Sequence, residues 1–453
     1  MGISDQRARA LSGIHAMDIP DRVPKQRYFD PDFYWMEAEL LWPRVWQMAC
    51  RLEEIPSPGD FAEYQILDQS VIVVRTDDLG VCAFQNACRH RGVKVVEGRG
   101  HSDSGFTCPF HGWCYTACGQ NTFVSRPATF SDHNMRHDDI SLTPLRSDVW
   151  GGCVWVNFDE EAPPLRHCIE PFATMLDAWR VESLHSEWWY ACRLPVNWKL
   201  AQEAFVEQYH VLETHPQLRI PGRYPRRDGA FDTRVFVDSE IHYLRLMNEG
   251  MAGMVHADDV HVAEGLRDIE LPADPALARV TWDRMLNEAV VGWHRAAGHD
   301  VPDLNDLNAR GLNQPMGYCF PHYFVLPMFS SASAYRFRPL GPEETLMEIW
   351  SLTRFPEGCE PDAPSPPEVW EYADPRWPPI LAQDFSNLPR QQRGLHARGF
   401  EYMRLSERAE GHISNFHRTI DGFLAGRSHE QLQHALQVIN VNPLEMSITD
   451  IGF

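Results

Sequence analysis

Two short segments near residue 100 each place one cysteine and one histidine close together. Cys88 and His90 form a Cys-x-His triplet, and after seventeen intervening residues Cys108 and His111 form a Cys-x-x-His group. A Cys2His2 set satisfies the tetrahedral preference of zinc. Zinc fingers of that composition, however, pair Cys with Cys and His with His, whereas each segment here supplies one of each. The arrangement favours a two-iron, two-sulfide cluster between two loop tips, with both thiolates on one iron and both imidazoles on the other.

A second group of metal-binding residue types follows further along the chain. His210 and His215 stand in the sequence NWKLAQEAFVEQYHVLETHPQ, together with several carboxylates. Two imidazoles and one carboxylate form the facial triad of non-heme Fe(II) oxygenases, which leaves positions open for dioxygen and substrate. On an ideal helix the two histidines point about 140° apart, so both can bind one ion only if the helix is distorted. Pro216, directly after the second histidine, indicates that the helix is ending. The nearby carboxylates are Glu203, Glu207 and Glu213.

The spacing of this histidine pair is weak evidence when taken alone. His412 and His417 have the same separation, and so do His429 and His434. Neither of these pairs has an acidic residue three positions ahead, and both lie in a polar stretch that we expect to form a solvated helix. The first pair differs because Glu207 stands one helical turn before it.

The two groups resemble motifs of one known family. CxHRG and CPFHGW are the forms of the Rieske domain in ring-hydroxylating oxygenases, and the segment with two histidines resembles the mononuclear iron motif of the same family. Respiratory Rieske proteins carry an extra disulfide-forming cysteine in each loop, where this chain has Val93 and Phe110. The resemblance implies one [2Fe-2S] cluster and one Fe(II). The implied ligands are Cys88, His90, Cys108 and His111 for the cluster, and His210 and His215 for Fe(II).

The resemblance also assigns roles to two carboxylates. The family takes its third iron ligand from an aspartate on a late helix, and in ILAQDFSNLPRQQRGL that residue is Asp384. Its alternative role is a helix N-cap. Asp374 is the next candidate ligand, although Tyr-Ala-Asp-Pro is typical of a turn. Glu207 stands where the family usually has an aspartate that bridges an iron-ligand histidine to a cluster histidine of a neighbouring subunit, so we predict the bridging role for it. Ala204 replaces a frequent asparagine.

Length and local patterning predict an α+β protein of two or three folding units. A chain of 453 residues, 43% of them hydrophobic, buries a large core. Residues 5–45 look helical, residues 46–160 contain short β-type runs separated by turn clusters such as 76–80, and later residues mix helical and strand-like stretches. We therefore predict three parts. They are an N-terminal helical segment, 1–45, packing on the catalytic domain, a small antiparallel β Rieske domain, 46–162, and a larger α+β catalytic domain, 163–453. The resemblance implies a central antiparallel sheet of the helix-grip, START-like type in the last, and the Pro-rich stretch 356–379 is expected to be a surface loop.

Composition and charge restrict the partners. A net charge of −22 argues against nucleic acid and anionic membrane surfaces. The sequence contains no run of about 18 apolar residues and its N-terminus lacks the apolar core of a signal peptide, so we expect a cytoplasmic protein that does not bind membranes. Its eleven cysteines are scattered and are expected to be mostly reduced.

The resemblance implies the large, catalytic subunit of a terminal oxygenase. Electrons from NAD(P)H would come through a separate reductase, with or without a ferredoxin, because the chain has no GxGxxG-type signal. The implied reaction uses O2 to hydroxylate a small apolar or aromatic substrate in a homotrimer, with or without a small beta subunit. One alternative is a Rieske monooxygenase that hydroxylates or oxidatively N- or O-demethylates a non-aromatic or methylated substrate. More remote alternatives are an electron carrier or zinc-binding protein without oxygenase activity, and a hydrolase with zinc in both sites.

Overall fold

The computed structural model describes residues 14–453, apart from 77–79, 228, 252–253, 357 and 444. These residues divide into two compact units. The larger unit contains residues 14–36, 169–361 and 366–453, and the smaller unit contains residues 37–168 and 362–365. Among the described residues, none of the helices is long and apolar enough to cross a membrane. The predicted domain bounds at 46, 162 and 163 stay predictions.

The smaller unit is built on an antiparallel sheet of seven strands. The predicted strands are present at VIVVR, VCAFQ and CVWVN, where β-branched and aromatic residues pack on a pleated surface. Residues 77–79 of the predicted turn lie outside the described residues. The order of the strands is β2 (Gln47–Arg51), β11 (Cys153–Asn157), β10 (Pro144–Trp150), β5 (Val81–Gln85), β4 (Gln69–Arg75), β3 (Asp60–Ile66) and β6 (Arg99–His101).

Two loops of this unit carry the Cys-His groups. The first loop joins β5 to β6, and the second joins β7 (Phe106–Thr107) to β8 (Cys114–Tyr115) in a small sheet with β9 (Asn121–Phe123). Gly92 and Gly112 have φ of 76° and 70°, a left-handed conformation that glycine adopts without a Cβ penalty. Each follows closely on a histidine of its loop, and each backbone N–H donates to the carbonyl of the preceding cysteine. The two loops therefore turn back in the same way.

The larger unit has a seven-stranded sheet at its centre. All neighbouring strands are antiparallel except β17 and β12, which pair in parallel. This architecture confirms the predicted fold class. The order of the strands is β17 (Glu368–Glu371), β12 (His185–Leu194), β16 (Glu344–Thr353), β15 (Ala332–Gly341), β14 (Tyr323–Pro327), β13 (Met316–Cys319) and β19 (Val441–Asn442).

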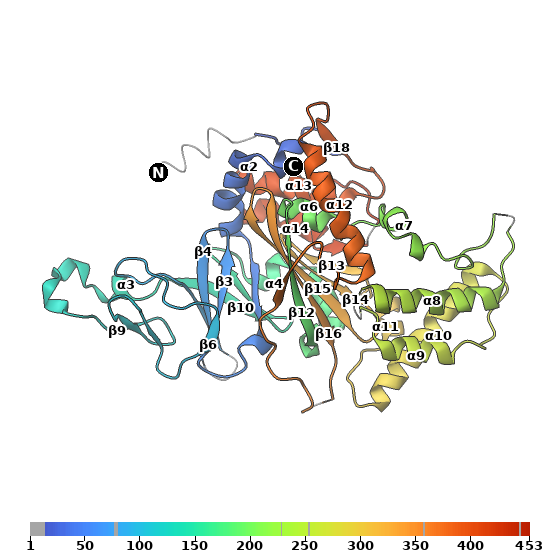
Figure 1. Cartoon of the computed structure of the whole chain (residues 1–453), viewed down its shortest axis with the longest axis horizontal. Helices are drawn as coiled ribbons and strands as arrows, with labels where there is room; N and C mark the ends of the chain where they lie inside the picture. Colours follow the sequence, from blue (N-terminus) through green and yellow to red (C-terminus); the bar gives the residue numbers. More distant parts are fainter. Residues whose placement is uncertain (1–13, 77–79, 228, 252–253, 357, 444) are drawn as a thin grey trace. The chain divides into compact units, whose positions relative to one another are not determined.

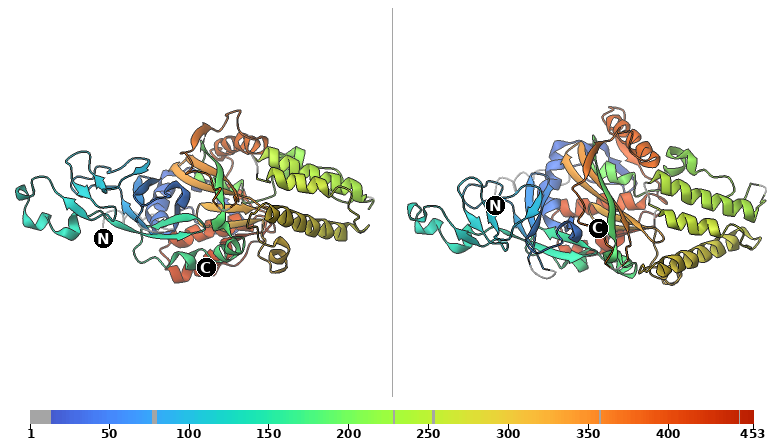
Figure 2. Two further views of the ribbon diagram at one scale, coloured as in Figure 1. Left: turned by 90° about the horizontal axis from the view of Figure 1, so that it is seen from below. Right: turned by 60° about the horizontal axis from the view of Figure 1, so that its bottom comes forward.

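Helices cover the sheet and extend from it. Figure 1 shows α6 (Trp198–Glu203), α12 (Pro379–Leu395) and α13 (Gly411–Leu424) gathered near one end of the sheet. Both views in Figure 2 show α8 (Thr233–Gly250), α9 (Ala257–Gly265) and α10 (Pro275–Ala296) side by side as a separate helical layer. Of the first group, α12 carries the candidate iron ligand Asp384.

The helical segment predicted for residues 5–45 is only partly present where the structure describes it. The segment contains β1 (Arg22–Pro24), a 3-10 turn, α2 (Pro31–Met36), a π-helical turn and another 3-10 turn. Four prolines, at positions 20, 24, 31 and 43, interrupt it, because proline cannot donate in a helix interior. Asp30 caps the start of α2, since its Oδ1 accepts the backbone N–H of Asp32 at 2.8 Å.

The prediction of a surface loop for residues 356–379 is also partly wrong. It contains β17, whose Trp370 is buried and whose backbone pairs in register with Tyr190 to Arg193 of β12. The alternation in Glu-Val-Trp-Glu, with one inward-facing tryptophan, is the pattern of a half-buried edge strand.

A buried ion cluster joins the two central strands of the larger unit. Arg336 on β15 and Glu348 on β16 are register partners and form two hydrogen bonds of 2.8 Å, and the Arg338 Nε donates to the same carboxylate at 2.9 Å. Burial alone would raise the pKa of Glu348, but the two guanidinium groups lower it to about 2. We expect Glu348→Ala to lower the free energy of unfolding by about 3–5 kcal/mol, because it leaves buried cations without their anion.

Chemical denaturation at neutral pH measures this loss. The folded-state pKa of Glu348 lies below its unfolded value, so its stabilisation is complete above the unfolded pKa and disappears as the pH falls toward 2. The difference between wild type and variant should therefore narrow below about pH 4. Glu344→Ala, which breaks the exposed pair of Glu344 with Arg193, is the matched control and should cost less than about 1 kcal/mol. Equal losses in the two variants would contradict the prediction.

Candidate metal centres

The two histidines of the second group do not share a helix. The helix α6 ends at Glu203, and a turn leads to α7 (Val211–Thr214), with His210 just before it and His215 just after it. Both histidines can approach one metal ion only if the helix is distorted, and here the helix is completely interrupted between Glu203 and Val211. Consequently the rings come together, with centroids 5.5 Å apart and planes at 74°.

Asp384 reaches this pair from α12. Its Oδ1 lies 3.2 Å from the His215 Nε2 and 3.6 Å from the His210 Nε2. Asp384 is the sixth residue of α12, so the alternative of an N-cap is wrong. In the part of the chain that the structure describes, these three residues form the only group of three or more His, Cys, Asp or Glu whose ligand atoms all lie within 4.8 Å. This donor set fits a facial 2-His-1-carboxylate iron site.

Each histidine is oriented by a hydrogen bond at its other ring nitrogen. The Nδ1 of His210 lies 2.5 Å from the Glu207 Oε1, and the Nδ1 of His215 lies 2.7 Å from the Gln383 Oε1. Both oxygens are acceptors, so each Nδ1 carries the proton and each Nε2 is free to bind a metal ion. Gln383 was not predicted, although its position directly before Asp384 would have pointed to it.

The electrostatics of the site follow from burial. Burial raises the pKa of the Asp384 carboxyl, and the two neighbouring histidines partly oppose that shift. Burial alone would lower the pKa of His210, but the Glu207 carboxylate raises it. A divalent cation would offset the cost of a buried carboxylate at this position.

The four residues of the first group lie at the tips of their two loops. The Nδ1 atoms of His90 and His111 are 3.1 Å apart, a separation that two imidazoles adopt when both bind one metal ion at about 2.1 Å. Cys88 and Cys108 are buried. Burial raises the pKa of the Cys88 thiol, and its neighbour Cys108 raises it further. The imidazoles thus form one pair and the thiols another.

This pairing argues against a single zinc ion. A tetrahedral zinc ion holds all four of its donor atoms within about 4 Å of one another. Among the described residues, the four ligand atoms of this group do not satisfy even a 4.8 Å limit for any three of them. Two separate pairs fit a cluster with two irons, and the alternative of zinc is not supported here.

Tyr115 makes a polar contact with the cluster loop. Its hydroxyl accepts the backbone N–H of Arg89 at 3.1 Å and lies 3.2 Å from the Cys88 Sγ, to which it can donate when that sulfur is a thiolate. Hydrogen bonds to cluster sulfurs raise the reduction potential, because the reduced cluster carries more negative charge. We expect Tyr115→Phe to lower the midpoint potential by tens of millivolts without loss of the cluster. A potentiometric titration followed by EPR measures the shift.

Tyr64→Phe is the matched control for this variant. Tyr64 is a buried tyrosine of the same unit whose hydroxyl donates to Gln47 at 3.1 Å. Its removal should leave the potential unchanged. A Tyr115→Phe protein with the wild-type potential would show that the hydroxyl serves only the backbone of Arg89.

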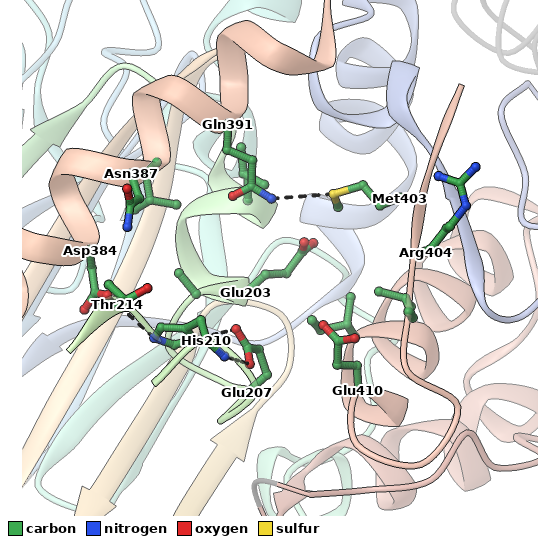
Figure 3. Close-up of a pocket in the computed structure, with 15 residues that line it drawn as sticks. Glu203, Glu207, His210, Thr214, Asp384, Asn387, Gln391, Met403, Arg404 and Glu410 are labelled. Atoms are coloured by element: carbon green, nitrogen blue, oxygen red, sulfur yellow. Dashed lines mark hydrogen bonds and ion pairs between the residues drawn. The ribbon is translucent and has the colours of Figure 1, made fainter. Parts of the chain in front are cut away.

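A cavity of about 250 Å³ lies beside the iron-ligand candidates. Figure 3 shows the carboxyl groups of Glu203, Glu207 and Glu410 around it, next to His210. Ala204, where the family often has asparagine, also lines it. Tyr209 and Leu212, which precede and follow His210 closely in the sequence, are 76% and 51% exposed.

The structure corrects the expectation for the later histidines. Both His412 and His417 are buried in α13, which is not the solvated helix that was predicted. The Nε2 of His417 lies 2.8 Å from the Glu203 Oε1, and the Tyr28 hydroxyl donates to the same carboxylate at 3.0 Å. Burial raises the pKa of Glu203 to about 8. Polar residues dominate this part of the sequence because they pair with one another, not because they face solvent.

Taken together, the fold and the two donor sets define a protein with an iron-sulfur electron-transfer domain and a mononuclear iron domain. The comparisons with known proteins agree. Residues 45–131 match the Rieske [2Fe-2S] domain, and residues 181–426 match the ring hydroxylating alpha subunit, catalytic domain. The chain belongs to the family of ring hydroxylating alpha subunits. The predicted cofactors, one [2Fe-2S] cluster and one mononuclear iron, are those of its two domains.

Individual relatives show how broad this family is. The chain is 30% identical over 199 residues to the alpha subunit of 2-aminobenzenesulfonate 2,3-dioxygenase from an Alcaligenes species, an alignment that covers 42% of this chain and 50% of that subunit. It is 26% identical over 203 residues to the oxygenase subunit of carnitine monooxygenase from Acinetobacter pittii. That alignment covers 44% of this chain and 54% of that subunit. The chain spans about half the length of these relatives. A crystal structure of a naphthalene 1,2-dioxygenase mutant bound to phenanthrene has the same fold, with a TM-score of 0.64, 19% identity, and coverage of 95% of this chain and 98% of that one.

Proposed function

We propose that this chain is the terminal oxygenase component of a ring-hydroxylating dioxygenase system. In this proposal it uses electrons from NAD(P)H, delivered by a partner reductase with or without a ferredoxin, to hydroxylate a small apolar, aromatic substrate with O2. One observation carries it. His210, His215 and Asp384 converge within 4.8 Å inside the region that matches the catalytic domain of the family.

We assign each donor set to one group. Cys88, His90, Cys108 and His111 would hold the [2Fe-2S] cluster, and His210, His215 and Asp384 would hold Fe(II). When bound, the cluster supplies single electrons and the iron activates O2. Glu207 and Gln383 hold the two iron-ligand imidazoles in one tautomer and orientation.

Glu207 also gives a reason to expect more than one copy of the chain. The Nδ1 atoms of His90 and His111 face each other, so their Nε2 atoms point away from the pair and are available as donors. Glu207 is only partly buried and lies beside the exposed Tyr209. We propose that Glu207 accepts a hydrogen bond from a cluster histidine of a second copy, in a closed homotrimer. Light scattering of the purified complex tests the trimer and shows whether a small beta subunit accompanies it. A cytoplasmic location is part of the same proposal.

The surroundings of the iron-ligand candidates support an apolar substrate. The rings of Phe205, Tyr335 and Phe337 lie together, with centroids 5.7 and 5.9 Å from that of Phe205. Phe385, next to Asp384, lies 6.5 Å from Phe205. The charged Arg336 and Glu348 lie on the opposite face of the sheet, because side chains alternate along a strand. This aromatic wall, and not the cavity lined by Glu203, Glu207 and Glu410, is the surface that suits a neutral ring.

One observation favours the alternative of a monooxygenase. A relative with 26% identity is the oxygenase subunit of carnitine monooxygenase, so this family also contains enzymes that act on methylated ammonium compounds. In that case the chain would hydroxylate a non-aromatic substrate or demethylate it oxidatively. The two reactions differ in product, because a cis-diol retains both atoms of O2, whereas hydroxylation and demethylation retain one.

Metal analysis combined with a product screen tests the proposal. The holoenzyme should contain about three irons per chain and no stoichiometric zinc, and show a Rieske-type EPR signal after reduction. With NADH, a reductase and ¹⁸O2, it should label aromatic candidates in preference to methylated amines. About two irons and no O2 consumption would make the chain an electron carrier, and zinc in both sites would support a hydrolase.

A further inference from the structure

A row of aromatic side chains runs from the neighbourhood of Asp384 toward the surface of the larger unit. Its members are Trp377, Trp370, Tyr190 and Trp188, called the aromatic row below. All four are tryptophan or tyrosine, the side chains that lose a single electron most readily apart from cysteine. Neither the iron site nor the aromatic wall of the proposed substrate pocket uses them.

The rings of the row are in contact from one end to the other. Trp377 and Trp370 have centroids 4.8 Å apart, Trp370 and Tyr190 4.3 Å, and Tyr190 and Trp188 4.9 Å in a stacked arrangement. A second contact links Trp377 to Tyr190 at 6.4 Å. At the inner end, Trp377 meets the ring of Phe385 edge to face at 5.0 Å.

The inner end of the row is close to the candidate iron site. Trp377 stands two residues before Pro379, the first residue of α12, and Asp384 is the sixth residue of that helix. Five residue steps of about 1.5 Å separate Pro379 from Asp384, which is about 8 Å of helix. Burial decreases outward, since Trp377 and Trp370 are buried whereas Tyr190 and Trp188 are partly exposed.

The outer end of the row offers the better site for an electron vacancy. The guanidinium of Arg376 lies 4.2 Å from the centre of the Trp370 ring, but it is paired with the carboxylates of Glu368 and Asp374, so the charges beside Trp370 balance. The Nε1–H of Trp377 donates to the carbonyl of Glu371, which is too weak a base to take the proton. Tyr190, in contrast, is near solvent and can release its phenolic proton when it is oxidised. The electron vacancy is therefore most stable on Tyr190, the tyrosine toward the outer end of the row.

We propose that the aromatic row carries oxidising equivalents away from the iron site when O2 activation is not followed by substrate oxidation. This inference rests on the proposed oxygenase function, which is the source of the oxidant. The oxidant takes one electron from Trp377, which recovers it from Trp370 or Tyr190. Tyr190 ends as a neutral phenoxyl radical after loss of one electron and one proton to water. A thiol reductant from solution then returns one hydrogen atom to it.

The test exposes the reduced holoenzyme to O2 together with a fluorinated aromatic analogue that occupies the substrate site but resists hydroxylation. Reductase and NADH reduce the full-length protein, and freeze-quenched samples are examined by EPR while peptides are mapped by mass spectrometry. In wild type we expect an organic radical near g = 2, and oxygen adducts on Trp370, Tyr190 and Trp188. Trp377→Phe should lose the radical and the outer adducts, and gain adducts on Phe205 or Tyr335. Trp377→Tyr, which restores an oxidisable ring, should recover the wild-type pattern.

Two internal controls separate this role from packing. Trp189 and Trp350 stack at 5.2 Å on the opposite face of the same sheet, so they should remain unmodified in every variant. Product formation with substrate should be equal in wild type and Trp377→Phe, because Trp377 belongs to neither metal site. Should Trp377→Phe fail to fold, Tyr190→Phe replaces it and should shift the adducts inward to Trp370.

The outcomes show separately whether the aromatic row carries oxidising equivalents and whether the proposed oxygenase function is correct. If O2 is consumed but the adducts are identical in wild type and Trp377→Phe, the aromatic row does not carry oxidising equivalents. Equal oxidation of Trp350 and Trp370 would contradict the proposal in the same way. If the reduced wild type consumes no O2 with the analogue or with any candidate substrate, the proposed function is wrong, and the inferred role of the aromatic row is wrong with it.

Discussion

Asp384→Ala is expected to abolish oxygenase turnover while leaving the [2Fe-2S] spectrum intact. The aspartate supplies the only carboxylate oxygen of the three-residue group, 3.2 and 3.6 Å from the two imidazole nitrogens. Loss of residues that merely orient metal ligands costs about 10–100-fold, so loss of a ligand should exceed 100-fold. Iron content should fall from about three to about two per chain. Product formation, iron analysis and the EPR signal of the reduced cluster measure the three effects.

Asp374→Ala is the matched control for this variant. Asp374 was the other candidate ligand, but it lies in a turn where its carboxylate accepts the backbone N–H of Arg376 at 2.9 Å and pairs with that side chain. It should leave turnover and iron content near wild type. Full turnover in Asp384→Ala would remove this residue from the proposed triad, and loss of the cluster signal would indicate a general folding defect.

Glu207→Gln is expected to lower turnover by about 10–100-fold while both iron centres remain. The glutamine keeps the length of the side chain and an acceptor for the His210 Nδ1, but it loses the negative charge that strengthens this 2.5 Å contact. It also weakens the hydrogen bond proposed to a cluster histidine of a second copy. Stopped-flow spectroscopy should show normal reduction of the cluster by the reductase and slow reoxidation in the presence of substrate and O2.

Two further variants define what the carboxylate does. Glu207→Asp restores the charge and the residue usual in the family, so it should recover much of the lost rate. Glu213→Gln removes a carboxylate of the same segment whose side chain is 83% exposed and pairs with Arg219, and it should have little effect. Glu207→Gln with a wild-type rate of reoxidation would show that Glu207 orients His210 and takes no part in electron transfer.

Sequence motifs were most informative where the ligands are local. Cys88 with His90, and Cys108 with His111, each come from a single loop, and the glycines after the histidines impose the turns. Their grouping in pairs agrees with a two-iron cluster and not with zinc. Local spacing is sufficient here because two or three residues of backbone determine where each ligand atom lies.

For the histidines outside the two cluster loops, spacing alone was insufficient to identify the candidate metal ligands. His210 with His215 and His412 with His417 have equal separation, yet the first pair flanks a helix break and the second is buried within α13. The difference depends on where each helix ends and what packs against it. Tyr28 and Glu203, which contact His417, come from distant parts of the sequence.

By itself the sequence determined the types of ligand, the cluster loops, the class of fold and the family, because these are encoded in contiguous residues and local backbone preferences. Tertiary structure decided that Asp384 joins His210 and His215, that Gln383 orients His215, and that Trp370 and Trp377 approach Tyr190. These contacts join α12 and β17 to segments far away in the chain. Such contacts form only when burial of apolar surface across the whole unit outweighs the entropy of ordering the intervening chain.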